Sequence, residues 1–144
     1  MKTREATQKD LKRWVELRHQ LWPDSPMESL GQEATSLLMS PDEVCFLAVD
    51  DSGIPLGFAE AAIHQALSGL YGHLEGWYVR PEYRGRGMGR ELVGCIEQWC
   101  LHRAIRILTS DTTPDYPLSP DAHKRSGFKK ICEFTIFMKE LDRG

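Results

Sequence analysis

The sequence of 144 residues lacks a charge excess of either sign, because 18 lysines and arginines stand against 21 aspartates and glutamates. The net charge of −3 gives no whole-chain basic surface of the kind that binds nucleic acid or an anionic membrane. Basic residues gather only within 80–90 and 124–130. We therefore expect no nucleic-acid partner and no membrane partner.

Long apolar runs are also missing. No stretch approaches the ~20 apolar residues of a membrane-spanning helix, and residues 1–7 contain no apolar run typical of a secretory signal peptide. We therefore expect a cytoplasmic protein. The length is typical of one domain, so we expect a single domain over residues 1–144.

Cysteine is scarce and shows no metal-binding pattern. No C-x-x-C pair is present, and no histidine stands at zinc-finger spacing around Cys45, Cys95, Cys100 or Cys132. Each cysteine lies in an apolar strand or helix pattern. This favours buried, reduced thiols over disulfides or a metal site, with a nucleophilic cysteine as the alternative. We expect no bound metal.

The most informative stretch that is present runs from His73 to Arg90, H-L-E-G-W-Y-V-R-P-E-Y-R-G-R-G-M-G-R. It begins as an aromatic, apolar strand, which Pro81 ends because proline cannot donate a backbone hydrogen bond. Glycines follow at three alternate positions, and apolar residues then repeat at helical spacing as far as Cys100. A strand, a glycine-rich loop and a helix N-terminus in this order predict a site for a diphosphate group.

The loop does not match two common phosphate-binding patterns. No Lys-Ser or Lys-Thr follows the glycines, as a P-loop would require, and Arg90 stands where the dinucleotide pattern G-x-G-x-x-G needs its last glycine. The loop does fit R-x-x-G-x-G, with Arg84, Gly87 and Gly89. A glycine-rich turn that merely begins a helix is the alternative.

The remaining pattern predicts an α/β domain with a central mixed sheet. A capping sequence at Thr7 and Asp10 begins one helix, which continues to about His19, and Ser25-Pro26 begins another. We expect helices at about 11–19, 26–39, 88–100 and 119–125, a loop at 67–72, and strands at 1–6, 44–49, 54–65, 73–79, 105–110 and 130–141.

The segment V-R-P-E-Y-R-G-R-G-M-G-R and the order of elements resemble the GNAT superfamily of acyl-CoA N-acyltransferases. The resemblance implies a mostly antiparallel mixed sheet that is splayed at its centre between residues 75–79 and 105–110 and flanked by helices, with acetyl-CoA as co-substrate. It implies that strand residues before the loop bind the pantetheine arm and that the loop binds the pyrophosphate. The implied cofactor residues are Trp77, Tyr78, Val79, Arg84, Gly85, Arg86, Gly87, Met88, Gly89 and Arg90.

The family's general acid has no direct match in this sequence. A tyrosine four residues before the Gly-Phe pair often protonates the leaving thiolate, but here His123 precedes Gly127-Phe128 at that spacing. Tyr116 stands where an asparagine is usual. His123, Tyr116 and solvent are therefore all candidates for the proton donor, and His123 without a catalytic role is the alternative.

Four strings in common order resemble a narrower group, the aminoglycoside 6′-N-acetyltransferases. They are L-R-H-Q-L-W-P (17–23), L-E-G-W-Y-V (74–79), S-D-T-T-P (110–114) and H-K-R-S-G-F (123–128). This resemblance implies acetyl transfer to the 6′-amine of a polycationic aminoglycoside, an antibiotic-resistance function, and a homodimer.

Three residues fit a cationic substrate. Glu75 is a carboxylate inside an otherwise apolar strand, which is costly unless the group is paired or solvated. Asp111 ends the neighbouring strand, and Trp22 offers a flat apolar wall with a π-face that attracts cations. We expect Glu75 to be both catalytic and substrate-binding, with Trp22 and Asp111 binding substrate. The structural alternatives are an internal ion pair for Glu75, a loop cap for Asp111 and a core position for Trp22.

The sequence departs from this narrower group in two places. The loop after Gln65 is shorter than the group's tyrosine-containing loop, and a carboxylate of the last strand falls near Cys132, with Glu133 one residue away on the opposite face. An N-acetyltransferase acting on a protein N-terminus or another small amine therefore remains an alternative. A non-catalytic acetyl-CoA-binding module is a second alternative.

Overall fold

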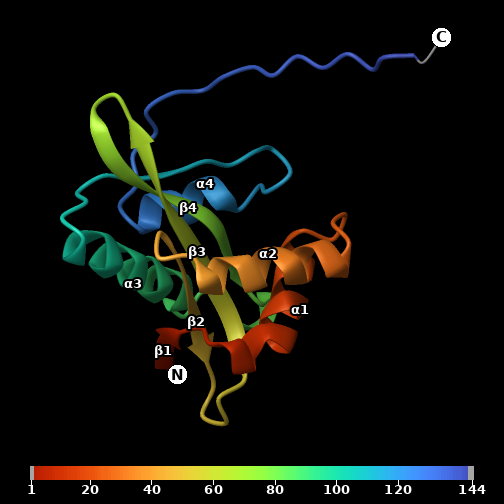
Figure 1. Ribbon diagram of the computed structural model, residues 1–144, viewed down its shortest axis with the longest axis vertical. Coiled ribbons are helices and arrows are strands. Elements are labelled where there is room, and N and C mark those ends of the chain that lie inside the picture. The colour runs from red at the N-terminus through yellow and green to blue at the C-terminus, as the bar shows by residue number, and fades with distance from the viewer. Residues whose placement is uncertain (1, 143–144) are drawn as a thin grey trace.

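A computed structural model describes residues 2–142 of the chain and shows one five-stranded sheet in the order β1-β2-β3-β4-β5 (Figure 1). The first three pairings are antiparallel and β4 pairs with β5 in parallel, so the predicted mixed, mostly antiparallel sheet is confirmed. The strands are β1 (Lys2–Glu5), β2 (Glu43–Val49), β3 (Pro55–Ala66), β4 (Gly69–Val79) and β5 (Leu108–Ser110).

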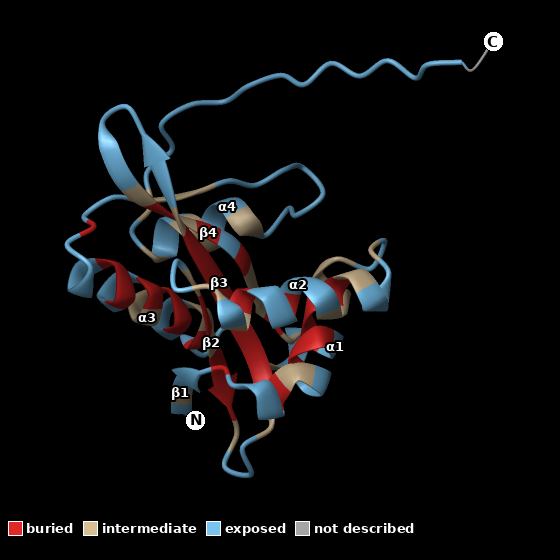
Figure 2. Cartoon of the chain, viewed as in Figure 1, coloured by how far each residue is buried: buried red, intermediate tan, exposed pale blue. Residues whose placement is uncertain are grey.

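Helices cover both faces of this sheet. One core lies between the sheet and α3, and a second lies between the sheet and the pair α1 and α2 (Figure 2). The helices are α1 (Leu11–Leu21), α2 (Met27–Met39), α3 (Met88–His102) and α4 (Ser119–Arg125), with short 3-10 turns η1 (Gln8–Asp10) and η2 (Pro81–Tyr83). The N-cap of α2 is Pro26, one residue later than predicted. Within residues 2–142, no helix is long and apolar enough to cross a membrane.

The predicted capping sequence before α1 is confirmed and also anchors β1. The Asp10 carboxylate accepts a hydrogen bond from the Thr7 backbone N–H (2.8 Å) and two from the Arg4 guanidinium (2.7 and 2.8 Å). The hydrogen bonds from Arg4 are the main reason why the pKa of Asp10 is lowered to about 2. The carboxylate thus links the first strand to the start of α1.

The β3–β4 connection differs from the predicted loop at 67–72. Ala66 pairs with Gly69, so only Leu67 and Ser68 form the turn, and β4 already includes the rest of the predicted loop. Gly69 adopts a φ of +122°, a conformation that glycine tolerates best. The long hairpin projects past the helices (Figure 1) and brings side chains from residues 64 and 71–75 onto neighbouring strands.

A β-bulge interrupts β4 at Glu75. Glu60 pairs with Gly76 and Ala61 pairs with Leu74, so Glu75 is the extra residue on its strand. A bulge locally bends a strand and changes the direction of its side chains. Leu74 is buried in the core facing α3, whereas the Glu75 side chain is 41% exposed.

The strands β4 and β5 part at this bulge. Their pairing covers only Gly72–Leu74 with Leu108–Ser110, and β4 continues to Val79 without a β5 partner. The expected splaying of the sheet is therefore present, although β5 is shorter than the strand predicted at 105–110. Ile105 still packs into the core from outside the strand.

The predicted final strand at 130–141 is wrong for this chain. Beyond Phe128 the backbone runs away from the body without pairing to the sheet (Figure 1), and its side chains are exposed (Figure 2). Cys132 is consequently exposed rather than buried. The sequence pattern is that of a half-buried strand, but residues 129–142 are all exposed.

We predict that Asp10→Asn lowers the free energy of unfolding at pH 7 by about 1–2 kcal/mol, because the charged partner of Arg4 is lost. The native pKa of Asp10 (about 2) lies below its ordinary value of 3.8. The difference in the free energy of unfolding between the wild type and Asp10→Asn is therefore complete above about pH 4, and it declines as the pH falls toward 2. Urea unfolding at pH 7 and pH 3 measures the difference. An Asp10→Asn deficit that is equal at both pH values, or no larger than that of exposed Asp24→Asn, contradicts the prediction.

Candidate functional site

The parting of the strands leaves one edge of β4 open. The Arg80 N–H donates to the Leu56 carbonyl (2.9 Å), and successive strand residues direct their backbone groups to opposite edges. Val79 therefore presents its backbone groups away from β3, and its carbonyl accepts a hydrogen bond from Arg84 Nε (2.8 Å). Trp77, two residues earlier on β4, presents its backbone groups to the same open edge. The open edge can bind an extended ligand by backbone hydrogen bonds.

The glycine-rich loop lies at the end of this open edge and leads into α3. Gly85 and Gly87 have φ values of +79° and +82°, and Gly87 is the N-cap of the helix. The space beside both glycines is open, so a ligand can approach the backbone. The first N–H groups of a helix have no acceptor within it and attract anions. Exposed arginines surround the loop at positions 84, 86 and 90. The loop thus fits a pyrophosphate group.

Trp77 and His123 meet beside the parted strands. Their ring centroids are 5.2 Å apart in an edge-to-face arrangement, and Trp77 Nε1 donates to the Gly89 carbonyl (3.0 Å). His123 Nδ1 lies 2.8 Å from the Ser119 carbonyl, which requires Nδ1 to carry a proton. In neutral His123, Nε2 therefore accepts from the Ser110 hydroxyl (2.7 Å). The structure places His123 between β5 and β4, next to the glycine-rich loop.

Tyr116 lies elsewhere. Its hydroxyl donates to the Leu21 carbonyl at the end of α1 (3.3 Å). The side chain of Tyr78 also turns toward α1, where its hydroxyl donates to Gln20 (3.0 Å), and the Arg84 guanidinium lies 5.5 Å from its ring centroid. Tyr116 and His123, both candidate proton donors, are therefore bonded to different parts of the fold.

A cavity of about 430 Å³ lies on the α1–α2 side of the sheet, and Glu75 lines it. Four of its lining residues are glutamates, contributed by α2, β2, β3 and β4. These glutamates are Glu33, Glu43, Glu60 and Glu75, and Trp22, Arg18 and His64 also line the cavity. We call it the acidic cavity. A cavity with this excess of carboxylates suits a ligand that carries several positive charges.

Trp22 forms one wall of the acidic cavity and rests on β4. Gly76 permits this contact, because a Cβ there would come within 2.7 Å of the Trp22 ring. The ring of Phe58 lies beside it at a centroid distance of 6.1 Å. The Arg18 guanidinium already stands 5.0 Å from the Trp22 ring centroid. Trp22 therefore packs against the core on one side and lines the acidic cavity on the other.

Arg18 and Glu60 form a buried ion pair behind this wall. Arg18 donates to both Glu60 oxygens (2.9 and 3.1 Å), to the Leu30 carbonyl (2.8 Å) and to Glu33 (3.0 Å), and Trp14 Nε1 also donates to Glu60 (2.8 Å). Burial lowers the pKa of the Arg18 guanidinium, but hydrogen bonds to Glu60 and Glu33 raise it above its ordinary value. The pair links α1 and α2 to β3 and fixes Trp22.

The two carboxylates predicted to bind substrate each have a histidine partner. His64 Nε2 lies 2.6 Å from Glu75 Oε1, and His73 Nε2 lies 3.5 Å from Asp111 Oδ2. Glu75 therefore pairs with a histidine rather than with an internal lysine or arginine. Asp111 is largely exposed and directly follows β5, whose Ser110 pairs with Leu74 beside the bulge.

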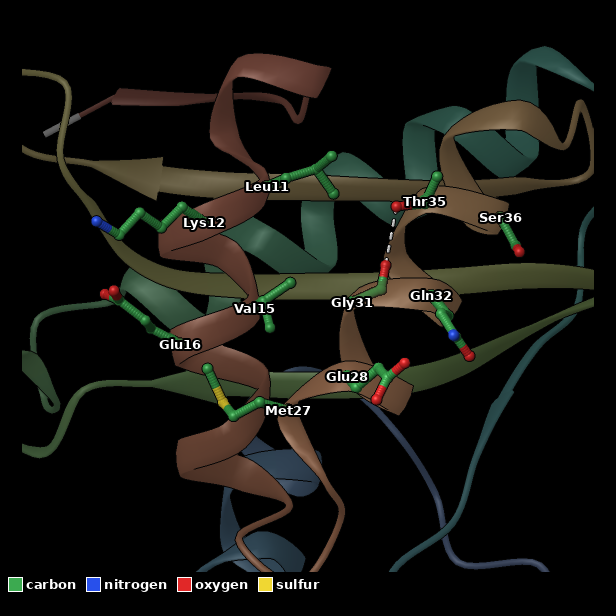
Figure 3. Close-up of a pocket in the computed structure, with 10 residues that line it drawn as sticks. All are labelled: Leu11, Lys12, Val15, Glu16, Met27, Glu28, Gly31, Gln32, Thr35 and Ser36. Atoms are coloured by element: carbon green, nitrogen blue, oxygen red, sulfur yellow. Dashed lines mark hydrogen bonds between the residues drawn. The ribbon is translucent and has the colours of Figure 1, made fainter.

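The open groove between α1 and α2 is larger, about 740 Å³, but none of the predicted site residues line it (Figure 3). Leu11, Val15 and Met27 supply apolar side chains, and the Thr35 hydroxyl donates to the Gly31 carbonyl within α2 (2.9 Å). The groove has no contact with the glycine-rich loop. We therefore place the functional site at the acidic cavity and the parted strands.

Burial disfavours two of the four cysteines as nucleophiles. The four cysteines are unpaired, and burial raises the pKa of Cys45 and Cys100, which makes both poor nucleophiles at neutral pH. Across residues 2–142, no three His, Cys, Asp or Glu side chains are grouped so as to hold a metal ion.

Sequence reasoning missed several residues of the site. Arg18 and Glu60 stand 42 positions apart, and only the folded helix brings them together. His64 and His73 lie on predicted strands, but no local pattern indicates their contacts with Glu75 and Asp111, which depend on strand pairing.

Comparison with known proteins agrees with this geometry. Residues 9–128 match the family described as "Acetyltransferase (GNAT) family". A Stenotrophomonas maltophilia protein named "Aminoglycoside N(6')-acetyltransferase type 1" is 34% identical over 96% of this chain and 93% of its own length. One of the same name from Salmonella enteritidis is 31% identical over 97% of this chain and 99% of its own.

Solved structures give the same result. AAC(6')-Iy in complex with the bisubstrate analog CoA-S-monomethyl-acetylneamine has a TM-score of 0.87 and 28% identity, covering 97% of this chain and 98% of its own. Apo AAC(6')-IG from Acinetobacter haemolyticus has a TM-score of 0.87 and 29% identity, covering 99% and 100%.

We predict that Glu60→Gln lowers the free energy of unfolding by about 3 kcal/mol, because Arg18 would remain buried without its main counter-charge. Glu33→Gln is the matched control, since it removes a mostly exposed carboxylate from the same guanidinium, and we expect a loss of at most about 1 kcal/mol. Urea unfolding of both variants at pH 7 measures the losses. Similar losses for the two would contradict the central place given to the buried pair.

The parted strands, the glycine-rich loop and the similarity over nearly the whole chain lead to one conclusion: this chain belongs to the acetyltransferase (GNAT) family.

Proposed function

We propose that the protein is an aminoglycoside 6′-N-acetyltransferase that uses acetyl-CoA, works as a single domain and confers antibiotic resistance. The observation that carries this proposal is the position of the acidic cavity, which adjoins the bulge at Glu75 where β4 and β5 part. A polycationic amine in the cavity would stand beside the open edge of β4. The names of the relatives agree with this substrate class.

The residues of the open edge and the loop fit acetyl-CoA. The N–H groups at the start of α3, together with Arg84, Arg86 and Arg90, would hold the pyrophosphate. The backbone groups of Trp77 and Val79 would hold the pantetheine arm as if it were a neighbouring strand. When bound, acetyl-CoA supplies an activated acetyl group as a thioester.

Direct attack by the substrate amine accounts for the remaining residues. Glu75 would orient the ammonium group and accept its proton, so that the neutral amine forms the new C–N bond as the C–S bond breaks. The Val79 N–H would stabilise negative charge on the carbonyl oxygen. Asp111 and Trp22 would bind other parts of the substrate. No covalent enzyme intermediate is needed.

The leaving thiolate takes up a proton in the last step. Of the two candidates, His123 is the better-placed donor, because it lies beside Trp77 and Ser110 at the parted strands. It would give up its Nε2 proton from the doubly protonated ring, since the one proton of the neutral ring is bound to the Ser119 carbonyl. Tyr116 is bonded to the end of α1 instead. A thiolate is a good leaving group, so a modest contribution from His123 suffices.

Acetylation of a protein N-terminus is the second candidate within the same family. An acidic cavity with four glutamates is poorly suited to an ordinary peptide, which carries one positive charge at its N-terminus. A non-catalytic acetyl-CoA-binding module is the candidate from another class. It would bind acetyl-CoA without releasing its thiol in the presence of any amine.

Thiol release from acetyl-CoA with a panel of aminoglycosides tests the proposal. We expect release with compounds that carry a 6′-amine and none with 6′-hydroxyl compounds. Glu75→Gln should lower kcat/KM by about 10- to 100-fold, because the ammonium loses its carboxylate partner. Glu28→Gln in the α1–α2 groove is the control and should match the wild type. No release from any compound, with acetyl-CoA still bound, would refute the proposed substrate class.

We propose that two copies form a homodimer by covering each other's C-terminal segments. Cys132, Phe134, Ile136 and Met138 alternate along one side of the extended segment, and all are exposed. Exposed apolar side chains also occur at Leu67 and Leu70 on the β3–β4 hairpin and at Ile107 just before β5, whose outer edge is unpaired within residues 2–142. A second copy offers both an identical sheet edge and an identical segment, so the contact is reciprocal. The four unpaired thiols fit a reducing, cytoplasmic location.

We predict that the wild type has twice the chain mass by size exclusion with light scattering, and that Ile136→Asp shifts it to one chain mass. Each apolar side chain on the segment contributes about 1.5–3 kcal/mol when fully buried, and a carboxylate there opposes burial. Glu140→Gln on the same side of the segment is the control and should remain dimeric. A wild type that stays monomeric across the assay concentrations would exclude the dimer.

A further inference from the structure

Both substrate-binding carboxylates of the proposed site are in contact with histidines that the acetyl-transfer mechanism does not use. His64 lies 2.6 Å from Glu75, and His73 lies 3.5 Å from Asp111. The two imidazoles meet edge to face at a centroid distance of 6.0 Å. The β3–β4 hairpin thus gathers two acid–histidine pairs at the mouth of the site.

The hydrogen bonds of His73 determine when its pair with Asp111 is attractive. The Thr109 hydroxyl donates to the Gly72 carbonyl (3.3 Å), so it accepts from His73 Nδ1 (2.7 Å). Nδ1 therefore carries a proton in the neutral ring, and Nε2 then presents a lone pair to the Asp111 carboxylate. Only protonated His73 attracts Asp111.

His64 contacts Glu75 through a hydrogen bond instead. Tyr71 stacks on the His64 ring at a centroid distance of 5.5 Å and limits its motion. Nε2–H donates to Glu75, and protonation of the ring adds a full positive charge next to that carboxylate. The other charged groups that line the same cavity as His64 are Glu43 from β2, Glu33 from α2 and the Arg18–Glu60 pair.

We propose that His64 and His73 are positioning residues that set the charge available to a cationic substrate, because in their protonated form they compete with its ammonium groups for Glu75 and Asp111. The inference rests on the proposed function. Histidine changes charge between about pH 5 and 8, so substrate binding should strengthen as the pH rises through this range. By reciprocity, a cation that binds to the carboxylates must expel protons from the histidines.

Proton release measured by calorimetry tests this directly. An aminoglycoside with a 6′-amine is titrated into the full-length protein at pH 6 in buffers of different ionisation enthalpy, without acetyl-CoA. The wild type should release about one proton more per bound ligand than His64→Gln/His73→Gln, and its Kd should weaken about three- to tenfold more between pH 8 and pH 6. The titration of the ligand's own amines is common to both proteins. His102→Gln at the end of α3 is the control and should behave as the wild type.

The possible failures are distinguishable. Equal proton release by the wild type and the double variant would overturn the inference while leaving the proposed function in place. A double variant that binds more weakly by the same factor at pH 6 and pH 8 would show a structural role only, and would also overturn it. Absence of binding at every pH, with thiol release also absent, would refute the proposed function and the inference together.

Discussion

The buried pair between Arg18 and Glu60 is the interaction on which the arrangement of the site depends. A single guanidinium holds the middle of β3, the backbone of α2 and an exposed carboxylate of α2, while it stands over the Trp22 ring. Two effects follow for the acidic cavity. Glu60 is neutralised by its partner and remains structural, whereas Glu75 and Glu43 keep the cavity acidic. The same contacts fix Trp22 against Gly76 and shape the wall beside the reaction centre.

The second constraint is the geometry of β4. Its bulge at Glu75 turns a carboxylate toward the acidic cavity at the same point where β5 departs. From there to Val79 the strand has one edge paired to β3 and the other open. A ligand arm can complete the sheet at that open edge, and the glycine-rich loop receives the ligand's anionic end. One strand therefore connects the two halves of the proposed reaction, with amine and thioester on either side of the bulge.

Local signals in the sequence predicted much of the fold around the site. Pro81, the loop glycines and the apolar repeat of α3 act over short distances, so the strand–loop–helix unit was predictable, as were the Thr7–Asp10 cap and the turn at Gly53. Pairings that depend on distant partners were not. The turn at Leu67-Ser68 lacks the usual Asn-Gly or Asp-Gly signal, so β4 was predicted too short. The contacts of His64 and His73 with Glu75 and Asp111 depend on strand pairing and have no local signal.

The C-terminal segment shows the opposite error. Its alternating pattern predicts a strand, but the segment leaves the body without pairing to an edge of the sheet. Cys132 was expected to be buried for the same reason. Glu75 was identified because burying a carboxylate in an apolar strand costs free energy. The bulge that exposes Glu75 depends on pairing with β3, so it could not be inferred from composition or periodicity.

The position of the acetyl group on the product tests the central claim most directly. An aminoglycoside that carries amines at several positions, including 6′, is converted with acetyl-CoA, and the product is examined by two-dimensional NMR. The account predicts a single N-acetyl group on the 6′-nitrogen, because the acidic cavity holds the other ammonium groups away from the open edge of β4. Acetyl groups spread over several nitrogens, or one at another position, would contradict it.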